Sequence, residues 1–139
     1  MGLMADASAD AASVETPEQS EQATPATLSD ADRKFMERVV QLMEKNMDNG
    51  NLVVDDLVSG VAVSRSVFFK KIKSLTGLAP VEFIREMRIR RAAQLIVQGD
   101  YTMTQIAYMV GISDSRYFSK CFKQLMGMTP TEYKERNRK

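Results

Sequence analysis

Lysine side chains recur at matching positions in two short segments of the sequence. The first, SRSVFFKKIKSLTG, covers residues 64–77, and the second, SRYFSKCFKQLMG, covers residues 115–127. Packing of a protein core does not require lysine, so repeated cations suggest a repeated contact with anions. Such side chains donate charge-assisted hydrogen bonds to phosphate oxygens and to base edges. At an offset of 50 residues, the matching pairs are Lys70 with Lys120 and Lys73 with Lys123.

The charge of the chain is unevenly distributed, although its formal net charge is only +1. Residues 1–32 contain seven acidic residues and neither lysine nor arginine. Of the 18 acidic residues, 11 therefore remain in residues 33–139, beside all 19 basic residues, which gives this part a net charge of +8. An acidic segment joined to a basic domain suggests a polyanionic partner. A solvated helical surface that happens to be basic is the simpler alternative.

Residue types that common enzymes and metal sites need are scarce in this chain. It contains no histidine and one cysteine, Cys121, so the usual transition-metal sites and histidine acid–base chemistry are not expected. The acids Asp55, Asp56, Asp100 and Asp114 lie at expected caps and turns, without a partner for acid–base work. We therefore expect no enzyme activity, no catalytic residue, no metal and no cofactor.

Targeting signals are also not evident. No apolar run reaches about 18 residues, and the first residues lack the basic and apolar regions of a signal peptide. A lone cysteine fits a reducing compartment. We expect a cytoplasmic location.

The chain divides into an acidic segment, residues 1–29, and a domain, residues 30–139. The first segment is rich in Ala, Ser, Thr, Glu and Pro, which predicts a disordered linker from a longer parent protein, or an added tag. In the second, apolar residues recur at three- and four-residue intervals, and no strand-like alternation of useful length is present. The pattern predicts an all-α domain of about seven helices. The expected helices cover about 31–48, 54–60, 65–75, 80–98, a segment opening at Thr102, 114–126 and 130–137.

Capping residues mark the ends of these helices. Ser29 and Asp32 form an S-x-x-D pattern at the first start, and Ser64 and Ser113 are expected N-caps. Gly77 suits a C-terminal cap, and its counterpart at the offset of 50 is Gly127. These signals fix where the two basic helices begin and end.

The repeated unit has the layout of a helix-turn-helix, in which a short helix supports a second helix across a tight turn. The units cover about 52–77 and 102–127, and the long helix 80–98 joins them. We expect Phe68, Ile72, Leu75 and their partners at the offset of 50 to form the core. The ten methionines are expected to be adaptable core filler. A duplicated helical hairpin with no role in binding DNA is the alternative.

With these motifs in view, residues 52–136 resemble the DNA-binding domain of the AraC/XylS family of bacterial transcription regulators. The resemblance is carried by SRSVFFKKIKSLTGLAPVEFIREMRIRRAAQLI and, more specifically, by TMTQIAYMVGISDSRYFSKCFKQLMGMTPTEYK. It implies two helix-turn-helix units that address the same face of DNA. The acidic segment beside this domain also resembles the output end of hybrid two-component regulators. RNA polymerase contacts and dimerisation through further domains are what such a parent implies.

The resemblance also assigns roles to the polar residues of both units. Arg116 is the strongest candidate, since a bidentate arginine–guanine pair is the commonest specific contact, and an ion pair with Asp114 is its alternative. Phe69 either meets a thymine methyl or packs against a neighbouring helix. The base-reading candidates are Arg65, Ser66, Phe69, Lys70, Ser115, Arg116, Ser119 and Lys120. The phosphate candidates are Lys71, Lys73, Lys123, Arg90, Arg91 and the helix N-termini at Ser64 and Thr102.

Further expectations concern two single residues and two rival functions. Tyr117 is assigned mainly to the core, although its hydroxyl could reach a phosphate. Arg88 is expected to brace the two units through pairs with glutamates. The main rival function is a helical protein-interaction module that binds an acidic partner with its basic face. RNA binding is disfavoured because no aromatic stacking platform is evident.

Overall fold

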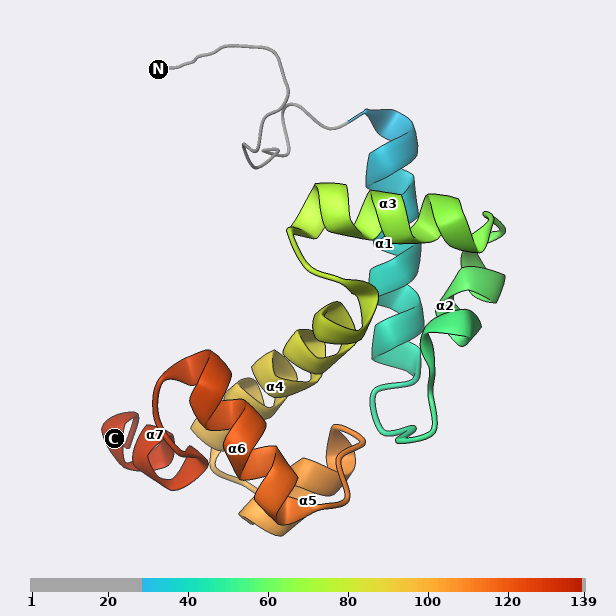
Figure 1. Ribbon diagram of the computed structural model, residues 1–139. Helices are drawn as coiled ribbons and strands as arrows, with labels where there is room; N and C mark the ends of the chain where they lie inside the picture. Colours follow the sequence, from blue (N-terminus) through green and yellow to red (C-terminus); the bar gives the residue numbers. More distant parts are fainter. Residues whose placement is uncertain (1–28, 139) are drawn as a thin grey trace, which may run out of the picture.

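The computed structural model describes residues 29–138, and seven helices make up most of them (Figure 1). No strand is present in this part of the chain, so the all-α, seven-helix prediction is confirmed. The expected acidic linker, residues 1–29, lies outside the described residues except for Ser29. The helices are α1 (Asp30–Lys45), α2 (Val54–Val61), α3 (Arg65–Thr76), α4 (Pro80–Gln98), α5 (Met103–Met109), α6 (Ser115–Met126) and α7 (Pro130–Arg136).

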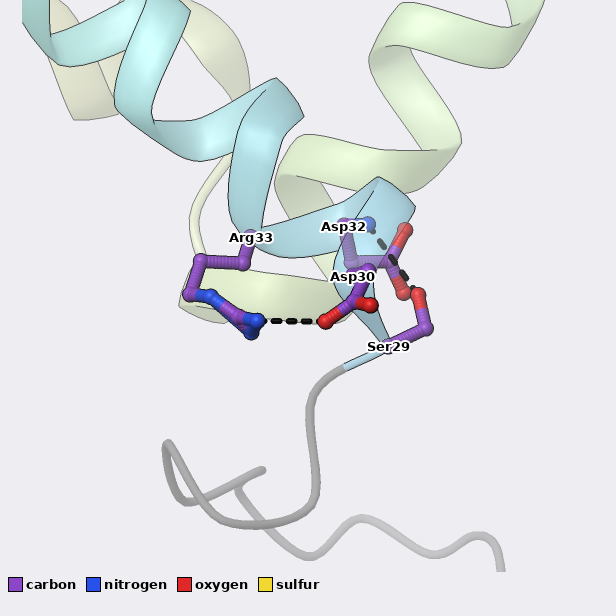
Figure 2. Close-up of polar contacts among 4 residues, drawn as sticks. All are labelled: Ser29, Asp30, Asp32 and Arg33. Carbon is purple, nitrogen blue, oxygen red and sulfur yellow. Dashed lines mark hydrogen bonds and ion pairs between the residues drawn. The ribbon is translucent and has the colours of Figure 1, made fainter.

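The start of α1 is fixed by its N-cap, Ser29. Its side-chain oxygen accepts a hydrogen bond of 3.0 Å from the backbone N–H of Asp32, and Arg33 pairs with Asp30 one turn along the helix (Figure 2). Two acids in the first turn also suit the positive end of the helix dipole. The predicted S-x-x-D cap is thus present in its serine half. The Asp32 carboxylate instead accepts a hydrogen bond of 2.6 Å from Lys71 Nζ.

We expect Ser29→Ala to lower the free energy of unfolding by about 1 kcal/mol, the usual cost of losing an N-cap side chain. Urea denaturation followed by circular dichroism measures this change. Ser59→Ala is the matched control, because Ser59 is exposed inside α2 and alanine suits a helix interior. Equal losses for the two variants would show that the Ser29 cap does not hold α1.

Two separate hydrophobic clusters form the core, one at each end of α4. The first combines α1, α2 and α3 with the start of α4. The second combines the rest of α4 with α5, α6 and α7. The buried members of the first are Phe35, Val39, Met43, Val54, Leu57, Phe68, Ile72 and Phe83. Those of the second include Ile89, Ala92, Ala93, Leu95, Ile96, Ile106, Ala107, Val110, Phe118 and Phe122.

Helix α4 has two roles, and these explain how one repeat becomes a continuous domain. Its first turn closes the first unit, as α7 closes the second: Pro80 and Pro130 are both buried at the start of their helices. Its later turns support α5 and α6, as α1 supports α2 and α3. The two units differ in what covers their second helix, as one matched pair of residues shows. Lys71 on α3 reaches an acid of α1, whereas its counterpart Cys121 on α6 is buried in the second cluster.

Two predicted helix boundaries need correction. Helix α6 begins at Ser115, because Asp114, not Ser113, accepts hydrogen bonds from the backbone N–H groups of Arg116 and Tyr117. Helix α1 ends at Lys45, because Asn46 leaves the helical conformation (φ −111°, ψ 21°) and its side-chain amide donates to the Leu42 carbonyl of the last turn.

The position of Leu125 also departs from the prediction. It was expected in the core, but it is 36% exposed.

None of the helices in residues 29–138 combines the length and apolar character that crossing a membrane needs.

Candidate nucleic-acid interface

Helices α3 and α6 expose the same pattern of positions. In Figure 1, α3 passes in front of α1 and α6 passes in front of the far end of α4, so both lie on the side that faces the viewer. The repeat seen in the sequence is therefore also a repeat of the exposed surface. The exposed pairs are Arg65 and Ser115, Ser66 and Arg116, Val67 and Tyr117, Lys70 and Lys120, Lys73 and Lys123, and Ser74 and Gln124.

On α3, two candidate side chains, Arg65 and Phe69, contact other residues of the protein, and two others, Ser66 and Lys70, form an open pair. Arg65 forms an ion pair with Asp55 of α2, and its guanidinium lies 4.8 Å from the centre of the Phe69 ring. Phe69 is half-buried against the first core cluster, which is the packing alternative to a base contact. Ser66 and Lys70 are exposed, and the structure gives their side chains no hydrogen-bond partner among the described residues. The open pair is therefore better placed to meet a ligand.

On α6, four candidates lie on the exposed surface of the first two turns: Ser115, Arg116, Ser119 and Lys120. The alternative for Arg116, an ion pair with Asp114, is not observed. The Asp114 carboxylate accepts from the backbone N–H of Arg116 at 2.9 Å and of Tyr117 at 3.2 Å instead. Within residues 29–138 the Arg116 guanidinium has no carboxylate partner.

Two exposed apolar side chains beside these cations were missed by the sequence analysis. Tyr117, assigned mainly to the core, is 47% exposed, and its counterpart Val67 is 40% exposed. The assignment of Tyr117 was wrong because Phe118 and Phe122 already fill the inward side of α6. An exposed apolar residue at the same place on both helices could meet a thymine methyl. The alignment at an offset of 50 residues was the signal that could have identified the pair.

The predicted phosphate contacts on α3 and α6 are not equally available. Lys71 turns to α1, where it pairs with Asp32 and lies 5.6 Å from the Phe35 ring centre. Lys73 Nζ donates to the Gly77 carbonyl at 3.2 Å, at the end of α3. Lys123 is exposed and lies near Glu132 of α7. Hydrogen bonds with the backbone and side chain of Thr129 lower the pKa of Glu132, and the positive charge of Lys123 lowers it a little further.

The remaining phosphate candidates lie on α4 and at two helix starts. Arg90 pairs with Glu86 at 2.9 Å, Arg91 donates to Gln94 at 3.0 Å, and both arginines line a hollow of about 490 Å³ between α1 and α4. Ser64 and Thr102 use their side-chain oxygens as N-caps, accepting from the N–H groups of Val67 and Gln105. Arg90 and Arg91 thus line a hollow apart from the exposed surfaces of α3 and α6.

Arg88 is the only buried charged residue in the described part of the chain, with 5% of its surface exposed. The prediction that it pairs with glutamates was wrong. Its guanidinium donates to three backbone carbonyls: those of Met47, Asn49 at 2.9 Å and Val110 at 2.6 Å. Burial lowers the pKa of Arg88, and the charge of Asp48 opposes that change. The arginine braces the two units, as expected, but through the backbone.

The sequence of this domain matches those of known proteins. The family described as "Helix-turn-helix domain" matches residues 57–136. The "Histidine kinase P4" of Formosa agariphila is 38% identical over 110 residues, which are 79% of this chain and 8% of that protein. The "MmsAB operon regulatory protein" of Pseudomonas aeruginosa is 30% identical over 65% of this chain and 29% of its own length. The chain thus spans less than a third of the length of these curated relatives.

Solved structures share the fold of this chain. An AraC-type transcriptional regulator from Chromobacterium violaceum is 28% identical, covers 80% of this chain and 98% of its own, and superposes with a TM-score of 0.72. The DNA-binding domain of AdpA, solved in complex with a target DNA, is 25% identical over 75% of this chain and 92% of its own, with a TM-score of 0.67. From its matched residues and its fold, the chain belongs to the helix-turn-helix family of AraC-type DNA-binding domains of transcription regulators.

Proposed function

We propose that the chain reads double-stranded DNA with α3 and α6 in successive major grooves on one face of the duplex. The observation that carries this proposal is the matched exposure of α3 and α6 at the two ends of α4. The 19 residues of α4 give it a length of about 28 Å at 1.5 Å per residue. Successive major-groove faces are about 34 Å apart, and the width of the two units supplies the difference.

The two helices present different base-reading groups. Helix α3 offers Ser66 and Lys70, and α6 offers Arg116, Ser119 and Lys120. A lysine can donate to guanine O6 and N7, and an arginine can do so with both arms of its guanidinium. The preferred site is therefore two unlike half-sites in tandem, which one chain can read without the two-fold symmetry of a dimer.

Two residues are placed to supplement this set. Val67 and Tyr117, exposed at equivalent positions, offer apolar surface for a thymine methyl, and the Tyr117 hydroxyl can also reach a phosphate. Arg65, held by Asp55 and Phe69, serves the interface more by supporting that aromatic ring than by reading a base. Lys73 and Lys123 lie at the ends of the two helices and are the better placed phosphate ligands.

The parent protein that fits this domain is a bacterial regulator acting in the cytoplasm. The Formosa agariphila relative is named as a histidine kinase, and the matched region is a small part of it. This relationship supports the domain as the output end of a hybrid two-component regulator. Contacts with RNA polymerase, and dimerisation through other domains of the parent, would then complete transcription control.

Selection of binding sites from random duplex DNA tests the proposal most directly. The expected result is enrichment of one asymmetric sequence with two short conserved blocks about one helical turn apart. Recovery of sequences without any shared block would contradict sequence-specific reading. A single conserved block would contradict the use of both helices.

Binding to the selected site is expected to weaken by on the order of a thousandfold between 50 and 200 mM salt, as release of counterions from about six phosphates requires. Fluorescence anisotropy at a series of salt concentrations measures the slope of log K against log salt. Lys123→Gln should reduce that slope by about 1. Arg90→Gln is the control, because Arg90 pairs with Glu86 and lines the hollow between α1 and α4, and its slope should match the unmodified chain. The reverse order would place the phosphate contacts on α4.

A further inference from the structure

One guanidinium bonds the two helix-turn-helix units to each other. The carbonyls of Met47 and Asn49 lie in the loop between α1 and α2, and that of Val110 follows α5. Helix α1 packs on the first helix-turn-helix unit in the first core cluster, so the first two carbonyls are fixed to the unit that carries α3, and the third belongs to the unit that carries α6. Arg88 itself lies at the middle of α4, between the two core clusters. A contact between the units is thus made beside the helix that joins them.

Two glycines bring the backbones of the units together at the same place. A Cβ atom on Gly50 would lie 2.8 Å from the Gly111 carbonyl oxygen, closer than real Cβ atoms approach. A Cβ atom on Gly111 would lie 2.0 Å from Arg88 Nη1. Gly50 has no positive φ, so its conformation does not demand glycine and only the contact does. Gly50, Arg88 and Gly111 together form the joint between the two units.

Beyond the joint, the units meet at α4 and at Met47, whose side chain packs against the second core cluster. The two core clusters have no buried residue in common, and their buried residues on α4 lie on successive stretches of that helix. Packed helices can slide slightly past one another, so a unit that packs on one stretch of a helix can rotate slightly about it. Three charge-assisted hydrogen bonds and a backbone contact across the units resist that rotation.

We infer that the joint sets the angle between α3 and α6, and thereby the spacing at which two half-sites can be read together. Arg88 is on this view a positioning residue that does not touch DNA. The inference rests on the proposed function for its consequence in DNA reading. Its structural part, the fixed angle, concerns the protein alone.

The first test measures the tolerance of spacing. Affinities are compared for the selected site and for the same site with one or two base pairs inserted between its blocks. The unmodified chain should lose roughly 10- to 100-fold on the inserted sites, since a displaced second block loses at least one base contact. Gly50→Ala and Arg88→Lys should reduce that loss to within a few-fold.

Gly99→Ala changes a glycine at the end of α4 whose added Cβ would meet nothing within 4 Å, so it should keep the full penalty for insertion. An unchanged penalty in folded Gly50→Ala would overturn the inference, whatever happens to Arg88→Lys.

The second test needs no DNA. Residual dipolar couplings of the free chain report the orientation of α3 relative to α6. We expect one shared alignment tensor for the unmodified chain and for Gly99→Ala, and two different tensors in Gly50→Ala. A shared tensor in Gly50→Ala would show that the joint does not set the angle, while leaving the proposed function intact. If the unmodified chain failed to bind DNA while Gly50→Ala showed two tensors, the proposed function would be overturned and the joint would stand.

Discussion

Replacing Gly111 by alanine is expected to lower the free energy of unfolding by about 3–5 kcal/mol, several times the loss at other left-handed glycines. Gly77, Gly99, Gly111 and Gly127 all have φ between 79° and 81°, so an added side chain meets a similar backbone cost in each, about 1–2 kcal/mol. At three of the four, the Cβ atom would meet nothing within 4 Å. At Gly111 it would displace the Arg88 guanidinium, whose hydrogen bonds to carbonyls are worth about 1.5–3 kcal/mol each.

Urea denaturation of the four glycine-to-alanine variants measures these losses side by side. A double-mutant cycle then identifies the cause, because residues in contact do not have additive effects. In an Arg88→Ala background, the further cost of Gly111→Ala should fall, but it should stay above that of Gly77→Ala, because the added Cβ would still lie 2.9 Å from the Met47 carbonyl oxygen. Four equal losses, or an additive cycle, would show that the guanidinium tolerates a Cβ atom beside it.

The positions of the helices could be predicted from the sequence because their signals are local. Ser64 and Gly77 begin and end α3 as expected, and a proline at the first position opens α4 and α7. Apolar residues three and four apart identify the buried side of each helix, as Phe68 and Ile72 show. The repeat at an offset of 50 residues then pairs the two units. These features depend on neighbours within one or two turns.

Features that depend on distant neighbours could not be predicted. Whether a position at the rim of a helix is covered depends on which helix lies beside it, so Leu125 and Tyr117 were wrongly placed in the core. The partners of Arg88 are backbone carbonyls, which every residue carries, and no residue type in the sequence marks them. A glutamate pair was the natural expectation for an arginine on a helix. The role of Gly50 was hidden for the same reason, since it depends on a segment 61 residues away.

The candidate site lies between these two cases. Its exposure follows from the helix periodicity, and the structure places Ser66, Lys70, Arg116, Ser119 and Lys120 on the surface. Their roles toward bases remain predictions, because a side chain in solvent has the same local environment whether it later meets a base or a phosphate. Lys71 is held in an ion pair with Asp32, 39 residues away, which only the fold brings near. Arg90 is held by Glu86 on the same helix, and that ion pair depends on the rotamers that the two side chains adopt.

Replacing Arg116 by alanine is expected to cost roughly 1–3 kcal/mol in binding to the selected site, which is about a 5- to 150-fold loss of affinity. Arg116 is exposed in the first turn of α6 and has no carboxylate partner in residues 29–138, so its guanidinium need not break an ion pair to bind guanine. The loss should be confined to sites that carry the guanine it reads. Binding to the same site with that base pair replaced should change little, so that preference at one position is relaxed.

Arg65→Ala supplies the comparison that separates base reading from general charge. It also removes one cation from the first turn of a recognition helix, but the Arg65 guanidinium is already held by Asp55 and the Phe69 ring. Its loss should therefore be smaller and nearly the same for all sequences. Anisotropy titrations of both variants against the selected site and its single-base variants give the two patterns. If Arg116→Ala weakened every sequence equally, Arg116 would be a phosphate contact, and specificity in α6 would have to come from Ser119 and Lys120.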